Sequence, residues 1–206
     1  MLSKILLKLY SVIRFSGIVA LVGGIVGSTV AYLRHPSLEE YWPVISNLGA
    51  YVSSAIWFNT TAVFVGIFLL SFWLGYSEHK GYSKFEQLIS TLPAIGVVGV
   101  GLFPANYGNC IFCLQRILHW AFAILFLLGI LVAVMIIAIK RWRRSNKYKT
   151  LAILSVLYIL LGIFLFLITY SPRYGLVIVE LFFIFYAIAI VTAQSLDWLF
   201  TEHVTI

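Results

Sequence analysis

The sequence has few charged residues and no long polar stretch. Charged side chains make up only 10% of the 206 residues, whereas 62% are hydrophobic and the mean hydropathy is +1.03. These values lie far outside the range of soluble domains, so they exclude an ordinary soluble protein. The polar segments are too short to form a separate aqueous domain, and there is no convincing internal repeat or low-complexity tract.

Long apolar segments are what the sequence does contain. A helix needs about 20 apolar residues to cross a bilayer. We therefore predict an all-α, polytopic membrane protein, a six-transmembrane-helix bundle that forms a single domain over residues 1–206. The predicted helices lie at roughly 15–33, 53–76, 85–104, 116–139, 150–170 and 176–199. Residues 1–14 read as a short basic amphipathic lead-in rather than a cleaved signal peptide.

The basic residues are distributed unevenly between the two predicted sides of the membrane. One side receives 11 of the 14 Lys and Arg residues, and the other receives Arg34, Arg116 and Arg173. We therefore predict a protein of the cell membrane, and the positive-inside rule places both of its termini on the cytoplasmic side. The net charge of +7 is explained by this topology, so we expect no nucleic-acid partner. The loops SEHKGYSK and KRWRRSNKYK are expected to be solvated anchors that meet the anionic leaflet.

Three polar residues lie inside predicted helices, each near an outer end: Asn59, His119 and Glu180. Polar and ionisable residues in a bilayer usually face the bundle interior and find a partner. We therefore predict a polar pocket near the outer leaflet, formed by the second, fourth and sixth helices with the first outer loop. Its candidate residues are Ser46, Asn47, Asn59, Tyr107, Gln115, Arg116, His119 and Glu180.

Two interpretations of this cluster remain open. It is either a structural hydrogen-bond network, with Glu180 paired to Arg116, Arg173 or His119, or a ligand or catalytic pocket. His119 and Glu180 have the chemistry of an acid and a base acting on a lipid ester, but no nucleophile motif accompanies them. No ligand motif links His35 with His119, so no metal site is predicted. The catalytic residues, if any, are unknown.

The two cysteines, Cys110 and Cys113, form a Cys-x-x-Cys step directly before the fourth predicted helix. The positive end of a helix dipole lowers a thiol pKa and favours exchange chemistry. The string CIFCLQR resembles the membrane thiol oxidases that reduce quinone. It departs from them because Gln115 and Arg116 come one position early and a second cysteine pair is missing. Quinone is expected as a cofactor only under this interpretation, whose alternative is a structural disulfide or two free thiols.

A longer pattern points elsewhere. WPVISNLGAY, then Asn59, then GVGLFPANYG leading into LHWAFA, is similar to the prokaryotic six-helix membrane family catalogued as domain of unknown function 998. The matching positions are Pro43, Ser46, Gly49, Asn59, Gly101, Phe103, Pro104 and His119. That family is distantly similar to the Frag1/DRAM/Sfk1 membrane proteins, which are associated with lipid remodelling. The resemblance implies a role with lipids but no reaction.

Together these features predict a lipid-interacting or scaffolding membrane subunit rather than an enzyme. Membrane lipids are the expected partners, and other membrane subunits stay open. No cofactor is predicted. The alternatives are a membrane thiol-disulfide/quinone oxidoreductase that uses Cys110 and Cys113, and a lipid hydrolase that uses His119 and Glu180.

Overall fold

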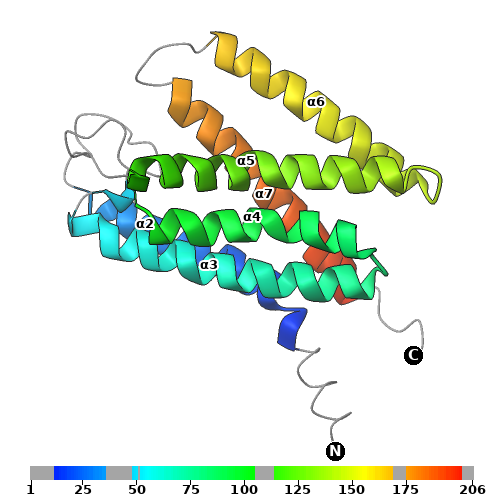
Figure 1. Cartoon of the computed structure of the whole chain (residues 1–206), viewed down its shortest axis with the longest axis horizontal. Coiled ribbons are helices and arrows are strands. Elements are labelled where there is room, and N and C mark those ends of the chain that lie inside the picture. Colours follow the sequence, from blue (N-terminus) through cyan, green and yellow to red (C-terminus); the bar gives the residue numbers. More distant parts are fainter. Residues whose placement is uncertain (1–11, 36–47, 51, 105–113, 169–174, 201–206) are drawn as a thin grey trace, which may run out of the picture.

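The computed structural model describes residues 12–35, 48–50, 52–104, 114–168 and 175–200 (Figure 1). Six long helices run through these residues, and each is long and apolar enough to cross a membrane. They are α2 (Ser16–Leu33), α3 (Val52–His79), α4 (Lys84–Leu102), α5 (Leu114–Lys140), α6 (Asn146–Ile168) and α7 (Gly175–Phe200). The predicted all-α fold with six transmembrane helices is confirmed.

The helices form an up-and-down bundle (Figure 1). Helices α3, α4 and α5 lie side by side, α2 packs against α3, and α7 crosses obliquely behind α4 and α5. Helix α6 lies outside, against α5 and α7. We call the end where α4 finishes and α5 begins the His119 end, and the opposite end, where α5 finishes, the Arg141 end.

Glycines allow the three central helices to pack closely. A Cβ atom on Gly66 of α3 would lie 2.8 Å from the backbone nitrogen of Val98 in α4. A Cβ atom on Gly96 of α4 would lie 2.6 Å from the backbone nitrogen of Phe126 in α5. Both distances are too short for any side chain, because backbone atoms cannot rotate away. Small residues at such crossings are how membrane helices approach one another.

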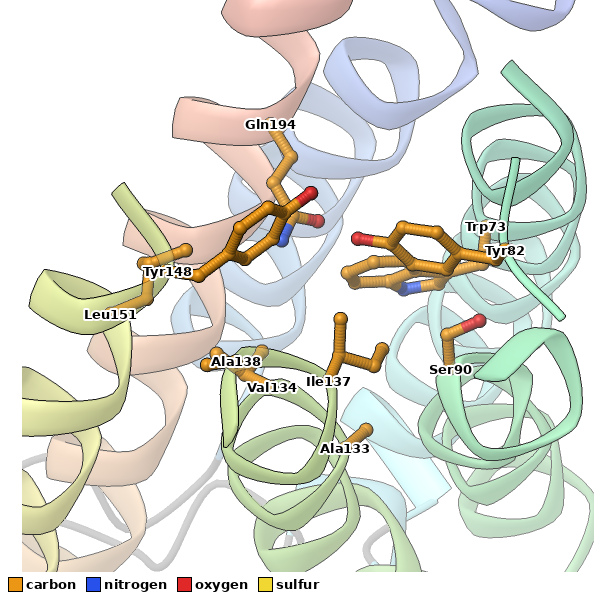
Figure 2. Close-up of a pocket in the computed structure, with 10 residues that line it drawn as sticks. All are labelled: Trp73, Tyr82, Ser90, Ala133, Val134, Ile137, Ala138, Tyr148, Leu151 and Gln194. Atoms are coloured by element: carbon orange, nitrogen blue, oxygen red, sulfur yellow. The ribbon is translucent and has the colours of Figure 1, made fainter. Parts of the chain in front are cut away.

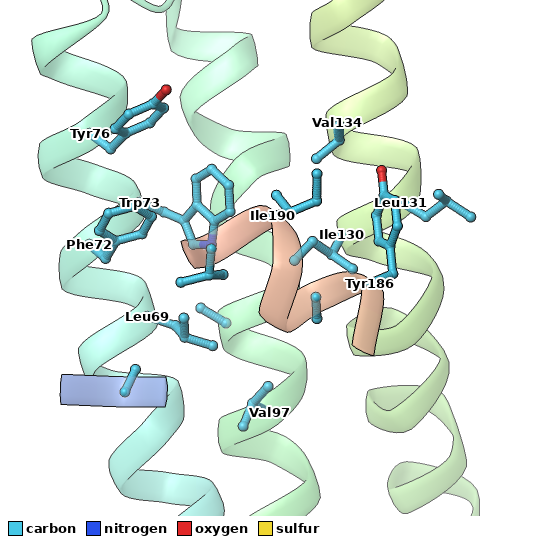
Figure 3. Close-up of a cluster of buried hydrophobic side chains, with 14 of the residues drawn as sticks. Leu69, Phe72, Trp73, Tyr76, Val97, Ile130, Leu131, Val134, Tyr186 and Ile190 are labelled. Atoms are coloured by element: carbon cyan, nitrogen blue, oxygen red, sulfur yellow. The ribbon is translucent and has the colours of Figure 1, made fainter. Parts of the chain in front are cut away.

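The largest buried apolar cluster lies inside this central layer (Figure 3). Part of its aromatic side comes from α3, where Phe72 packs edge-on against Trp73 and stacks on Tyr76, with ring centroids 5.4 and 5.5 Å apart. Ile130 of α5 and Ile190 of α7 contribute the aliphatic part. These contacts hold α3, α5 and α7 in one unit.

Helix α6 is the least buried of the six. Only 17% of its membrane-spanning window is buried, and large apolar side chains such as Leu160 and Phe164 are exposed. Its inner face is fixed by polar contacts to α7: the Ser155 hydroxyl lies 2.8 Å from the Tyr186 hydroxyl, and the Tyr158 hydroxyl donates to the Phe182 carbonyl. One face of α6 is therefore exposed and apolar.

Candidate functional site

His119 lies in the second turn of α5 and is only 1% exposed. Its Nδ1 atom is 2.8 Å from the backbone oxygen of Phe103, the residue that caps the end of α4. A carbonyl oxygen can only accept, so Nδ1 carries the hydrogen and donates it. The last carbonyl groups of a helix lack partners within that helix. His119 therefore satisfies a carbonyl that follows α4 and ties α5 to α4 there.

Gln115 makes a second contact of the same kind one turn earlier in α5. Its Nε2 atom donates to the backbone oxygen of Pro104 over 3.3 Å. Beside these two hydrogen bonds, the ring of Phe103 stacks on Phe122 of α5, with centroids 5.5 Å apart and planes 7° from parallel. The start of α5 is thus fixed to the end of α4 by two side-chain hydrogen bonds and a ring stack.

Asn59 of α3 holds the residues before its helix. Its Nδ2 atom donates to the backbone oxygen of Gly49 over 3.2 Å. The Ser54 hydroxyl donates to the backbone oxygen of Leu48 over 2.7 Å. Asn59 Oδ1 is buried and has no hydrogen-bond partner among the described residues. A Cβ atom on Gly49 would lie 2.5 Å from this oxygen, so glycine leaves the space that the amide occupies.

Asn59 and His119 both pack on the end of α4. A Cβ atom on Gly101 would lie 2.6 Å from the Asn59 backbone oxygen, and Phe103, two residues later, accepts the His119 hydrogen bond. Asn59, Gly101, Phe103 and His119 all belong to the family-like pattern in the sequence. In the structure they form one connected cluster. Arg116 of α5 and Glu180 of α7 are partly exposed.

Other predicted site residues lie outside the described residues. They are Pro43, Ser46, Asn47, Tyr107, Cys110 and Cys113. The predicted pocket as a whole and the redox pair therefore stay predictions. Within the described ranges, no group of three or more His, Cys, Asp or Glu side chains is placed to hold a metal ion.

Sequence reasoning missed a buried ion pair at the Arg141 end. The Arg141 Nε atom lies 2.9 Å from Glu86 Oε1, and both side chains are about 5% exposed or less. Arg141 also donates to the backbone oxygens of Lys80 and Gly81, over 3.2 and 2.9 Å. Its guanidinium lies over the Tyr82 ring, 4.3 Å from the centroid. The hydrogen bonds to Glu86 raise the pKa of Arg141.

A capping box positions the acidic partner. The Ser83 backbone nitrogen donates to Glu86 Oε2 over 2.7 Å, and the Ser83 side chain accepts from the Glu86 backbone nitrogen. This reciprocal pattern fixes the start of α4. The sequence Ser-Lys-Phe-Glu carries its signal, Ser followed three residues later by Glu. The loop expected to be solvated therefore contains a buried structural centre.

Asp197 of α7 organises a second ion-pair group at the same end. It lies 2.9 Å from both Lys80 and Lys147, and it accepts a hydrogen bond from the Tyr76 hydroxyl over 3.0 Å. These partners belong to α3, the following turn and α6. The carboxylate thus joins α7 to α3, to the turn that follows α3 and to α6.

A groove on the bundle surface lies at the Arg141 end, where α2 begins. Its volume is about 440 Å³, and its lining is almost entirely apolar. It is formed by Val12, Ile13, Phe15, Ser16, Val19, Phe68 and Ser71. The two serine hydroxyls donate to carbonyls of neighbouring turns, at Ile13 and Ile67, so they leave the groove walls apolar. The Arg14 guanidinium lies 5.1 Å from the centroid of the Phe15 ring.

The comparisons with known proteins identify a family but no individual relative. No curated protein and no solved structure matches the chain. One family model does match, over residues 10–197, which includes all six membrane helices up to the last turn of α7. The match covers far more than half of the sequence, and it agrees with the resemblance carried by Gly49, Asn59 and His119. The chain belongs to the family described as protein of unknown function DUF998.

Proposed function

We propose that this protein is a lipid-interacting subunit of the cell membrane and that it holds a phospholipid in the groove where α2 begins. The supporting observation is the groove itself, about 440 Å³ of almost wholly apolar space on the membrane-facing surface. Ligand pockets of about 300–1,000 Å³ are typical for bound small molecules. A groove of this kind takes an acyl chain.

The groove combines exposed side chains at the start of α2 with more buried ones, because Ile13 and Phe68 pack against the main core cluster and Ser16 is 4% exposed. Val19 is 37% exposed and Phe15 45% exposed. Because the serine hydroxyls bind their own helices, the groove offers contact but no hydrogen bonds to a bound molecule. Van der Waals packing of a hydrocarbon chain is the interaction that suits it.

Arg14 supplies the charge complement for a phosphate group. Its guanidinium lies over Phe15, which lines the groove, so the cation and the apolar space are adjacent. Arginine binds phosphate oxygens through two parallel hydrogen bonds. An anionic phospholipid with its phosphate at Arg14 and one chain along Val19 and Phe68 satisfies both features.

The distribution of basic residues supports a cytoplasmic position for this end. Nine described basic residues belong to the Arg141 end: Arg14, Lys80, Lys84, Lys140, Arg141, Arg143, Arg144, Lys147 and Lys149. Cytoplasmic leaflets are rich in anionic lipids, which attract such residues. Both termini are then cytoplasmic, and the proposed lipid belongs to the inner leaflet.

The cluster at the His119 end has a different proposed role. The partners of His119 and Gln115 are backbone carbonyls after α4, which supports a structural network that fixes helix register. Asn59 Oδ1, which has no hydrogen-bond partner in the part of the chain that the structure describes, supports the other interpretation, a small polar pocket at the outer leaflet. The hydrolase alternative rests on His119 and Glu180, and the thiol–quinone alternative rests on the two cysteines, which lie outside the described residues.

The experiment is native mass spectrometry of the protein purified in mild detergent, with bound phospholipid counted by mass. Ser71→Phe places a ring in the groove, so the fraction that carries phospholipid is expected to fall several-fold. Arg14→Gln is expected to reduce the preference for anionic over zwitterionic lipid.

Matched controls separate these effects from general changes in the surface. Thr60→Phe adds the same ring to an exposed position of α3, away from the groove, and Arg143→Gln removes an exposed cation of the α5–α6 loop. Both controls are expected to keep the lipid of the parent. Equal retention by Ser71→Phe and Thr60→Phe would show that the groove does not hold the lipid.

A further inference from the structure

A small cavity lies inside the bundle in its Arg141 half (Figure 2). Its volume is about 10 Å³, and side chains of α3, α4, α5, α6 and α7 surround it together with the turn after α3. The polar side chains among its lining are Trp73, Tyr82, Ser90, Tyr148 and Gln194. About 10–15 Å³ of such volume accommodates one water molecule, so nothing larger fits.

Two of these side chains carry buried polar atoms without a hydrogen-bond partner among the described residues. One is the indole nitrogen Nε1 of Trp73, a residue that is 2% exposed. The other is the amide oxygen Oε1 of Gln194, which is 9% exposed. Buried polar groups are paired in the great majority of cases, so two unpaired atoms at one cavity require an explanation.

The chemistry of the two atoms is complementary. An indole N–H only donates, and an amide oxygen only accepts. A molecule that pairs with both must accept one hydrogen bond and donate another. A metal or ammonium cation lacks the acceptor and a fully deprotonated anion lacks the donor, whereas a neutral molecule with an O–H group has both. The cavity volume then selects water.

Neighbouring side chains add further hydrogen-bonding groups to the cavity lining. The Ser90 hydroxyl donates to the Gln87 backbone oxygen over 2.8 Å, which leaves its oxygen able to accept another hydrogen bond. Figure 2 shows the Tyr82 hydroxyl and the Gln194 amide pointing toward the middle of the cavity from opposite sides. Internal waters make about three hydrogen bonds, so a water that pairs with Trp73 and Gln194 has the capacity for one further partner among this lining.

We propose that this cavity is a binding site for one ordered water molecule, which accepts from Trp73 Nε1–H and donates to Gln194 Oε1. The water links α3 to α7 through the bundle interior. Asp197, one turn after Gln194 in α7, binds Lys80 at the end of α3. The water bridge and the ion pair then form two successive attachments between the same helices.

X-ray hydroxyl-radical footprinting tests the site, because irradiation of a bound water produces radicals beside buried residues. The purified full chain supplies its own control: Trp73 and Trp198 are 2% and 3% exposed, and only Trp73 lines the cavity. Trp73 is expected to be oxidised several-fold faster than Trp198, even when a radical scavenger in the buffer suppresses labelling at exposed residues. Equal rates, or loss of Trp73 labelling with the scavenger, would overturn the proposal.

A variant gives a second reading. Gln194→Leu removes the acceptor, so the ratio of Trp73 to Trp198 labelling is expected to fall toward one. An unchanged ratio in a folded variant would contradict the site. If Gln194→Leu does not fold, Tyr82→Phe removes the hydroxyl that points into the cavity and is expected to lower the same ratio (Figure 2). The comparison of the two tryptophans in the parent still decides.

Discussion

Arg141 and Glu86 form a two-point ion pair between the end of α5 and the first turn of α4. Nε lies 2.9 Å from Oε1, and Nη2 lies 3.2 Å from Oε2. The same guanidinium binds two backbone oxygens of the α3–α4 turn. One side chain therefore fixes the relative positions of three helices at this end of the bundle.

Removing one partner of this pair is expected to be strongly destabilising. Glu86→Gln leaves Arg141 charged and buried, and losing one partner of a buried pair costs about 3–5 kcal/mol. Thermal unfolding in detergent measures the effect, with Glu78→Gln, an exposed carboxylate at the end of α3, as the matched control. Similar midpoints for both variants would show that the pair contributes little.

Asp197 gives an ion-pair contribution that responds to salt. Its partners Lys80 and Lys147 are 21% and 49% exposed, so each pair is worth about 0–1 kcal/mol. Salt screens exposed charges. The parent is expected to lose stability between low and high salt, and Asp197→Asn is expected to start lower and change less. Parallel salt curves for parent and variant would contradict this.

His119 can be tested by replacing its hydrogen-bond donor. His119→Leu leaves the Phe103 oxygen without its partner, at a cost of about 1–3 kcal/mol. His119→Asn places an amide nitrogen near the position of Nδ1 and is expected to recover much of the loss in thermal unfolding. Equal destabilisation by both substitutions would show that the hydrogen bond is not what His119 provides.

Two glycines test the close packing of α4 and α5. Gly96→Ala places a Cβ atom 2.6 Å from a backbone nitrogen, so it is expected to destabilise by about 1–3 kcal/mol. Gly129→Ala meets its nearest atom, Pro93 Cγ, at 3.5 Å, and alanine in a helix is favoured by about 0.5–1 kcal/mol. The Gly129 variant is therefore expected to match or exceed the parent in thermal stability. A stable Gly96→Ala variant would contradict the observed packing.

Hydropathy was sufficient to predict the helices but not their polar ends. Helix α6 begins at Asn146, about four residues before the predicted apolar segment. Its first turn contains Lys147 and Lys149, and lysine favours helix although its charge lowers the mean hydropathy. The roles of Glu86 and Arg141 depend on contacts between residues 55 positions apart, which no local pattern reports. Only the capping box at Ser83 gave a local signal.

The candidate site was predicted in part for the same reason. The sequence singled out Asn59 and His119 as polar groups that need partners. In the structure Asn59 of α3 and His119 of α5 both contact the end of α4. Their partners are backbone oxygens, which every residue has, so composition gives no sign of them. The groove at α2 depends on how apolar side chains pack and where they leave space between them. Hydropathy reports only that side chains are apolar, so it does not predict the groove.

Photocrosslinking with an anionic phospholipid that carries a photoreactive acyl chain tests the central claim most directly, with adducts located by peptide mass spectrometry. Helix α6 is the internal control, because the smallest share of its span is buried and many of its large apolar side chains are exposed. A lipid held in the groove predicts adducts concentrated near Val19, Phe68 and Ser71, and several-fold fewer after Ser71→Phe. Adducts spread over α6 as densely as over the groove, unchanged by Ser71→Phe, would contradict lipid binding at this site.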